Sequence, residues 1–237
     1  VELWENLKTA CVNGRRTGLG THGLADALAC LSLAYDSEEA IKIIDNIYTT
    51  LKTSAYTESA ALAKERGAFP VFDWDKEKDN AFIKSLPKSV QDLISKFGRR
   101  NISILTNAPT GSVSIMSQTS SGIEPVFRNS YTRRRKLSHN ETDIQADFVD
   151  DLGDKWTEYE VFHHNVRAYL DANNTTEIPD FFTESDAIDW ETRVRIQATI
   201  QKHIDHSISS TINLPKGTDP EVVSRLYQLG WKLGLKG

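Results

Sequence analysis

The chain has 237 residues, of which 39% are hydrophobic and 26% charged, and its net charge is −5. This length suits one large domain or part of a larger one, and the composition is that of a soluble globular protein. The acidic balance excludes a general attraction to nucleic acid or anionic membranes. No apolar stretch approaches the roughly 20 residues that span a bilayer. We therefore predict neither nucleic acid nor a membrane as a partner.

The first half of the chain is predicted to be mostly helical. Four glycines between Gly14 and Gly23 indicate a tight segment shaped by its backbone. Ser37, followed by two glutamates, has the pattern of a helix N-cap. The spacing of apolar residues predicts helices, in chain order, over residues 1–12, 24–31, 38–67, 78–86 and 89–97.

The second half alternates between strands and helices. Strands are predicted over Ile102–Thr106 and Ser207–Leu214, and helices over residues 142–151, 158–173, 190–205 and 220–233. The basic run from Arg133 to Lys136 is interpreted as a solvated rim and not as a binding patch. Strands covered by helices indicate the α/β class, with a helix-rich first half.

Cysteine usage and the chain ends complete the general description. Cys11 and Cys30 form neither a disulfide framework nor a CxxC motif, which fits a reducing, cytoplasmic setting. Cys30 lies in an apolar run and is predicted to be buried. The chain starts at Val1 without methionine and stops at Gly237 without a tail. We expect residues 1–237 to be one partial domain, truncated at both ends.

The loop from Pro109 to Ser114 is the main candidate for ligand binding. It follows a predicted strand and precedes a short predicted helix, a junction that exposes backbone N–H groups suited to anions. Gly111 permits close approach of the backbone, and the hydroxyls of Thr110, Ser112 and Ser114 add donors. No GK[ST] sequence follows, so this is not a Walker loop. From the residues alone, a phosphate site and an ordinary turn both remain open.

Several polar residues have two readings each. His203 and His206 have the spacing of metal ligands, but no third ligand accompanies them, and histidines are common at helix ends. No metal site is predicted. Glu124 could act as an acid or base, or could fix the loop exit by hydrogen bonding. His22 could face a cofactor or stabilise its turn. Arg15-Arg16 could bind phosphate or form a buried ion pair.

The loop residues Pro109, Thr110, Gly111, Ser112, Val113 and Ser114, followed by Ser121–Pro125, resemble the substrate-phosphate loop and GIEP segment of ribonucleotide reductase large subunits. Other segments resemble that family in the same order, so the resemblance covers nearly the whole chain. They are Arg15–Gly20, Gly23–Asp26, Tyr35–Ala40, Leu62–Pro70, Ser210–Pro215 and Gly234–Gly237.

The resemblance implies the C-terminal part of a ten-stranded α/β barrel. It also implies a ribonucleoside-diphosphate reductase that converts ribonucleotides to deoxyribonucleotides by thiyl-radical chemistry. The catalytic cysteines of the family would lie outside this chain, and Cys11 and Cys30 do not match them. No catalytic residue is therefore assigned. Residues 109–114 would bind the substrate phosphates.

The sequences APTGS, THGLAD and TSSGIEPVF are most similar to the class II enzymes, which implies adenosylcobalamin as cofactor. A ribonucleotide substrate and a thioredoxin- or glutaredoxin-type reductant would be the partners, and a homodimer is compatible with the family. A class I reductase, a non-catalytic nucleotide-binding module and a helical interaction domain remain the alternatives.

Overall fold

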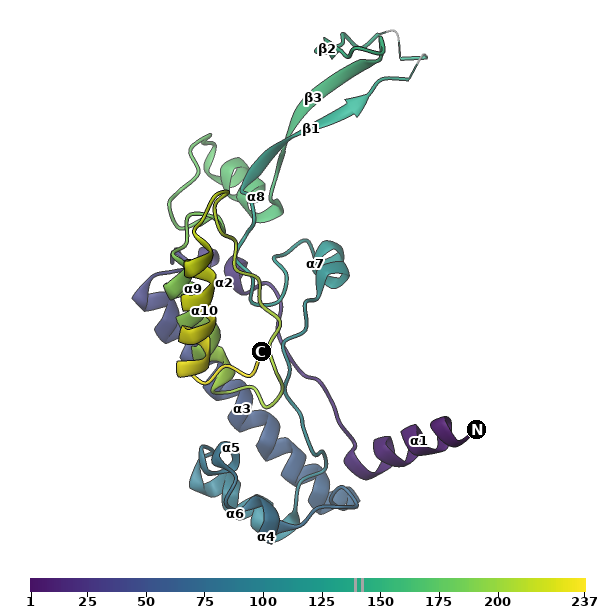
Figure 1. The fold of residues 1–237 in the computed structure, drawn as a ribbon, viewed down its shortest axis with the longest axis vertical. Helices are drawn as coiled ribbons and strands as arrows, with labels where there is room; N and C mark the ends of the chain where they lie inside the picture. Colours follow the sequence, from purple (N-terminus) through teal and green to yellow (C-terminus); the bar gives the residue numbers. More distant parts are fainter. Residues whose placement is uncertain (139, 142) are drawn as a thin grey trace.

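A computed structural model describes residues 1–138, 140–141 and 143–237 of the chain. Helices dominate its first half, as predicted, and strands appear only after residue 129 (Figure 1). The elements, in chain order, are α1 (Glu2–Gly14), α2 (Leu24–Cys30), α3 (Glu38–Arg66), α4 (Trp74–Glu77), α5 (Ala81–Lys84), α6 (Lys88–Phe97), α7 (Gly111–Ser117), β1 (Ser130–Lys136), β2 (Phe148–Val149), β3 (Lys155–Phe162), α8 (His164–Asn173), α9 (Trp190–Gln201) and α10 (Pro220–Lys232).

Helix α3 is the longest element, with 29 residues, and the main core forms around it. The Ser37 side chain accepts a hydrogen bond from the Ala40 N–H at 3.1 Å, which confirms the predicted N-cap. Helices α6 and α9 pack against α3. The side chains of Ile44 and Tyr48 on α3 and of Ile196 on α9 are fully buried in this core. The packing fixes the frame on which the later loops are held.

Three extended segments run parallel to one another between the helices. Bridges join Leu19 to Leu105 and Asn107 to Ile208, so the segment around residue 105 lies in the middle. The predicted strands at 102–106 and 207–214 are thus extended, but they pair through isolated bridges and not through continuous ladders. Parallel segments connected by helices are the arrangement of an α/β fold.

Close contact between these segments depends on Gly20. A Cβ atom at this position would lie 1.8 Å from the carbonyl oxygen of Thr106, a distance that no side chain could occupy. The neighbouring Asn107 is buried, and its Oδ1 accepts from the Thr21 N–H at 3.1 Å. The glycine-rich segment is therefore a close backbone contact, as its composition predicted.

A β-hairpin extends away from the helical body (Figure 1). Strands β1 and β3 pair antiparallel from Ser130 opposite Phe162 to Lys136 opposite Trp156, and β2 pairs with β3 at the far end. The predicted helix over 142–151 is wrong for the described residues 143–151, and residue 142 lies outside the description. The helix predicted over 158–173 is confirmed only from His164 onward, as α8. Aromatic and β-branched residues recur through residues 156–162 and favour the strand.

The basic run lies on β1 and is exposed to solvent. Arg134 pairs with Glu158 at 2.7 Å, Arg135 with Glu141 at 2.8 Å, and Lys136 with Asp154 at 2.5 Å. Exposed pairs of this kind contribute about 0–1 kcal/mol each. The acidic partners neutralise most of the run, which confirms its interpretation as a solvated rim.

Two further observations concern surface residues. Cys30 is exposed, so its predicted burial is wrong; α2 buries Leu28 and Ala29 and leaves the next residue outside the core. Cys11 is exposed as well. Among the described residues, none of the helices combines the length and the apolar character needed to cross a membrane.

Candidate functional site

The predicted loop forms a strand-to-helix junction in the structure. Thr110 has a left-handed backbone with φ 52°, and α7 begins at the next residue, as predicted. Within the described chain, no group accepts from the backbone N–H of Gly111, Ser112 or Val113. Unpaired N–H groups at such a turn are donors for an anion. The geometry therefore supports the predicted type of site.

Of the six predicted residues, four are exposed, Thr110 is half-buried and Ser114 is buried. Pro109, Gly111, Ser112 and Val113 are exposed, and a Cβ atom added to Gly111 would meet nothing within 4 Å. Ser114 is buried, and its hydroxyl donates to the Gly111 carbonyl at 2.8 Å. The open side of the loop thus has three free N–H groups and the Ser112 hydroxyl, while Ser114 stabilises the turn from within.

Residues 119–122, which we call the strap, run beside this loop and hold it. The Thr119 N–H donates to the Ser114 carbonyl at 3.0 Å, and the Gly122 N–H donates to Thr110 Oγ1 at 2.8 Å. Gly122 has φ 48°, and a Cβ atom there would approach the Ala108 carbonyl oxygen to 3.0 Å. A glycine is needed at this position because both the backbone angle and the close contact disfavour a side chain.

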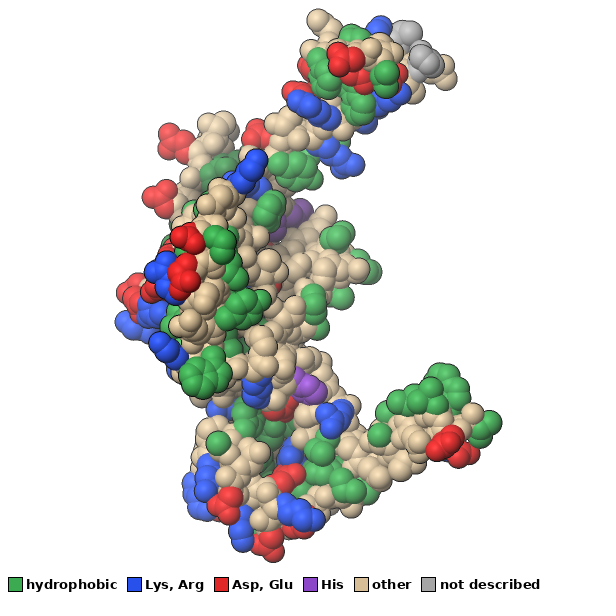
Figure 2. All heavy atoms as spheres, viewed as in Figure 1, with side chains coloured by type: hydrophobic (Ala, Val, Ile, Leu, Met, Phe, Trp, Pro, Cys, Tyr) green, Lys and Arg blue, Asp and Glu red, His purple; other side chains and the backbone are tan. Residues whose placement is uncertain are grey.

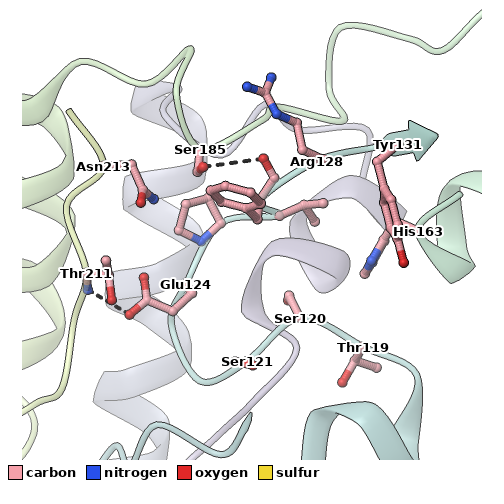
Figure 3. A pocket seen from close by; sticks show the side chains of 13 residues that line it. Thr119, Ser120, Ser121, Glu124, Arg128, Tyr131, His163, Ser185, Thr211 and Asn213 are labelled. Carbon is pink, nitrogen blue, oxygen red and sulfur yellow. Dashed lines mark hydrogen bonds between the residues drawn. The ribbon is translucent and has the colours of Figure 1, made fainter. Parts of the chain in front are cut away.

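The strap also lines a cavity of about 390 Å³ (Figure 3). Polar side chains from four parts of the chain surround the cavity: Thr119, Ser120, Ser121, Glu124, Arg128, Tyr131, His163, Ser185, Thr211 and Asn213. The Ser120 Oγ is buried and has no hydrogen-bond partner in the described structure. The cavity adjoins the loop because Ser121 Oγ lies 2.7 Å from Ser114 Oγ.

Glu124 fixes the exit of the strap. Its Oε2 accepts from the guanidinium of Arg193 at 2.8 Å, and its Oε1 accepts from the Thr211 N–H at 2.8 Å. Arg193 also donates to the Tyr35 hydroxyl, which in turn donates to the Ile123 carbonyl. Burial raises the pKa of Tyr35 to about 12, so this hydroxyl stays protonated. The structural reading of Glu124 is confirmed.

Asp26 holds the other side of the strap. Its Oδ2 accepts from the Ser120 N–H at 2.5 Å, and its Oδ1 lies 2.7 Å from His163 Nε2. Burial raises the pKa of Asp26, but hydrogen bonds from His163, Asn165 and the Ser120 N–H outweigh it, and the pKa lies below its usual value. The carboxylate is therefore charged at neutral pH.

Most of the remaining polar candidates have structural partners. His203 Nε2 lies 2.8 Å from Asp45 Oδ1, and His206 Nε2 lies 2.8 Å from Ser103 Oγ, so the two imidazoles do not converge. His22 Nδ1 lies 3.1 Å from Thr119 Oγ1, in agreement with a role in stabilising its turn. Arg15 donates to the Ala68 carbonyl at 2.8 Å and Arg16 is exposed, so the reading of this pair as a buried ion pair is wrong for the described structure. In the described part of the chain, no three His, Cys, Asp or Glu side chains are grouped to bind a metal.

Sequence reasoning found the loop but missed the residues that support it. Asp26 lies in the Gly23–Asp26 segment, which carries a family resemblance but no local chemical signal, and its partners are 94 and 137 residues away along the chain. Arg193 lies in a helix whose other inward residues are mostly apolar or amide side chains. A charged residue on the buried face of a predicted helix was the one signal that could have identified it.

Comparisons with known proteins agree with the resemblance. The family described as "Ribonucleotide reductase, barrel domain" matches residues 4–237. The vitamin B12-dependent ribonucleoside-diphosphate reductase of Mycobacterium tuberculosis is 33% identical over 94% of this chain and 30% of its own length. The protein of the same name from Thermoplasma acidophilum is 29% identical over 98% of this chain and 29% of its own length.

More distant relatives match too. The ribonucleoside-diphosphate reductase subunit alpha of Helicobacter pylori is 26% identical over the whole chain and 29% of its own length. A solved structure, the class Id ribonucleotide reductase alpha subunit of Actinobacillus ureae, superposes with a TM-score of 0.66 at 20% identity. It covers 95% of this chain and 38% of that one, and it supports the predicted fold. The chain thus spans between 29% and 38% of the length of these proteins.

Proposed function

This chain belongs to the ribonucleotide reductase barrel family, and from that premise we propose that it is part of an enzyme that reduces ribonucleotides to deoxyribonucleotides. The names of the relatives support this activity, since the bacterial and archaeal proteins at 26–33% identity are all named as ribonucleoside-diphosphate reductases. The thiyl radical and the cysteine pair of the reaction are assigned to no residue of this chain.

The role proposed for this segment is to bind the phosphates of the substrate. The observation that carries it is the row of free N–H groups at Gly111, Ser112 and Val113, which faces open space beside the Ser112 hydroxyl. These groups are donors of the kind that phosphate oxygens accept. Holding a phosphate remote from the reacting ribose fixes the ribose in position and lowers the entropic cost of the reaction.

The cofactor proposed for the whole enzyme is adenosylcobalamin, which would supply the radical. The names of two relatives, from Mycobacterium tuberculosis and Thermoplasma acidophilum, support this choice over a class I enzyme. The donors at the loop suit phosphate oxygens, and we assign none of its residues to the cofactor. A thioredoxin- or glutaredoxin-type reductant, a homodimer and a cytoplasmic location are proposed for the whole protein on the same family basis.

An activity assay tests this proposal. The full-length protein that contains residues 1–237 is incubated with a ribonucleoside diphosphate, a dithiol reductant and adenosylcobalamin. We expect deoxyribonucleotide to form only when all three are present. Product without cobalamin would contradict the class II assignment. Binding of the nucleotide without any product would favour a nucleotide-binding module, and no binding at all would contradict the whole proposal.

A further inference from the structure

Asp26 joins two distant parts of the molecule through one buried carboxylate. It lies in the first turn of α2, and only 5% of its surface is exposed. Its two oxygens contact different elements: Oδ2 accepts from the Ser120 N–H, and Oδ1 contacts His163 at the junction of β3 and α8. Ser120 and His163 lie close together at one side of the cavity (Figure 3).

The strap carries this contact onward to the phosphate loop. Two hydrogen bonds hold Ser120 against the start of α2. Its N–H donates to Asp26, and its carbonyl accepts from the Gly23 N–H at 2.8 Å. The next two residues face the loop: Ser121 contacts Ser114, and Gly122 donates to Thr110. Three successive residues therefore connect α2 to both ends of the 110–114 turn. A shift of Ser120 would move the frame that orients the free N–H groups.

We infer that Asp26, supported by His163, is a positioning residue for substrate binding: it sets the place of the strap and thereby the orientation of the loop N–H groups. This inference rests on the proposed function of the loop. Hydrogen bonds to an anion weaken steeply with distance and angle, so a binding constellation must be held within about 0.5 Å. Asp26 itself belongs to neither the loop nor the cavity lining, and it acts through the backbone of Ser120.

The cost of burying Asp26 argues that its contacts are specific. A carboxylate removed from water is unfavourable unless donors surround it. Here the donors are a backbone N–H of the strap and an imidazole that follows the hairpin, and neither belongs to the main apolar core. An apolar residue in α2 would fill the same space without that cost, but it would leave the Ser120 N–H without an acceptor.

Two variants at one position separate positioning from charge and from folding. In Asp26→Asn, the amide oxygen can still accept from the Ser120 N–H, and the amide NH₂ can donate to a neutral His163. In Asp26→Ala, both contacts are lost. For the full-length protein, we expect the Kd for a ribonucleoside diphosphate to rise about tenfold in Asp26→Ala and to stay within about threefold in Asp26→Asn. Calorimetric titration without turnover measures both, and thermal unfolding of each variant is recorded alongside.

The outcomes are distinguishable. An unchanged Kd in Asp26→Ala, with only the Tm lowered, would reduce Asp26 to a structural residue and overturn the inference. A loss in Asp26→Asn as large as in Asp26→Ala would also overturn it, because hydrogen-bond geometry would then not be the cause. If Asp26→Ala does not fold, His163→Ala replaces it; the expected rise in Kd is about fivefold and must exceed the rise in Asp26→Asn, and an unchanged Kd would overturn the inference. Gly111→Leu is measured in parallel: if it leaves the Kd unchanged, the proposed function of the loop fails instead.

Discussion

His203 is a buried histidine with one satisfied and one unsatisfied ring nitrogen. Its Nε2 contacts Asp45 at 2.8 Å, while its Nδ1 is buried and, within the described structure, has no partner. Burial lowers the pKa of His203, although the hydrogen bond to Asp45 acts in the opposite direction. A second proton would have to sit on the nitrogen that lacks an acceptor. The folded protein therefore favours neutral His203.

This lowered pKa predicts a loss of stability in mild acid. The unfolded chain protonates this histidine near pH 6.5, while the folded protein resists protonation to lower pH. The stability is therefore fully present above about pH 6.5 and declines as the pH falls toward the folded-state pKa. Urea unfolding at pH 7.5 and 5.5 should show a smaller difference in His203→Gln than in the parent. His164→Gln, at an exposed position, is the control and should behave like the parent. Equal pH dependence in His203→Gln and the parent would contradict this account.

At the same scale, the sequence was informative about residues whose effect is local. The Ser37 cap acts within three residues, and the loop hydroxyls and Gly111 lie within one short segment. The contacts by which Asp26 and Arg193 hold the strap and its exit could not be predicted from local sequence. Each contacts groups more than 60 positions away along the chain, and no local pattern encodes such a contact.

Among the elements, the hairpin is the clearest separate unit. The described residues between 130 and 161 contribute none of the buried side chains of the main core, and the hairpin projects from the body (Figure 1). Its outer half is stabilised by its own contacts, including Phe148 stacked on Trp156 with ring centroids 6.2 Å apart. The hairpin is linked to the body at its base, where the Asn129 side-chain amide donates to the Phe182 carbonyl and His163 Nε2 lies 2.7 Å from Asp26 Oδ1.

We therefore expect the outer hairpin to be dispensable for folding. Residues 134–158 are replaced by Asn-Gly, a two-residue turn that suits the pairing of Arg133 with Tyr159. The Tm of the full-length protein should change by less than about 4 °C, because little apolar surface of the core is lost. Differential scanning calorimetry measures this. A fall of about 10 °C or more would show that the hairpin packs against further parts of the protein.

The hairpin is also where the sequence-based prediction is wrong, because it places helices where the structure has strands. Charged residues recur between residues 142 and 160 at a spacing that suits a helix as well as an exposed strand. A strand with both faces in water lacks the apolar alternation that identifies half-buried strands. Helices α3, α9 and α10 were predictable because each has a buried or partly buried stripe at helical spacing, with a capping residue at its start.

On the scale of the whole molecule, large apolar side chains remain exposed on several helices, among them α1 and α10. Trp4 on α1 is 74% exposed and Trp231 on α10 is 81% exposed, and green side chains cover much of α1 in Figure 2. The curated relatives are about three times as long as this chain, and the barrel-domain family matches its residues 4–237. The α/β class followed from the alternation of strands and helices, whereas the barrel could be named only from the resemblance. The three extended segments between the helices of the described chain pair only through isolated bridges, and these do not define a barrel by themselves.

The binding of substrate phosphates by the 109–114 loop is the central claim of this account. Its most direct measurement is the Kd of the full-length protein for a ribonucleoside diphosphate, compared between the parent, Gly111→Leu and Ser89→Leu. The leucine at position 111 points into open space, so folding should be unaffected while the free N–H groups are obstructed. Ser89→Leu adds the same side chain to the exposed first turn of α6 and serves as the matched control.

We predict a Kd at least about tenfold higher for Gly111→Leu, with an unchanged Tm and with Ser89→Leu equal to the parent. An unchanged Kd for Gly111→Leu, or a loss of affinity accompanied by a lower Tm, would contradict the claim.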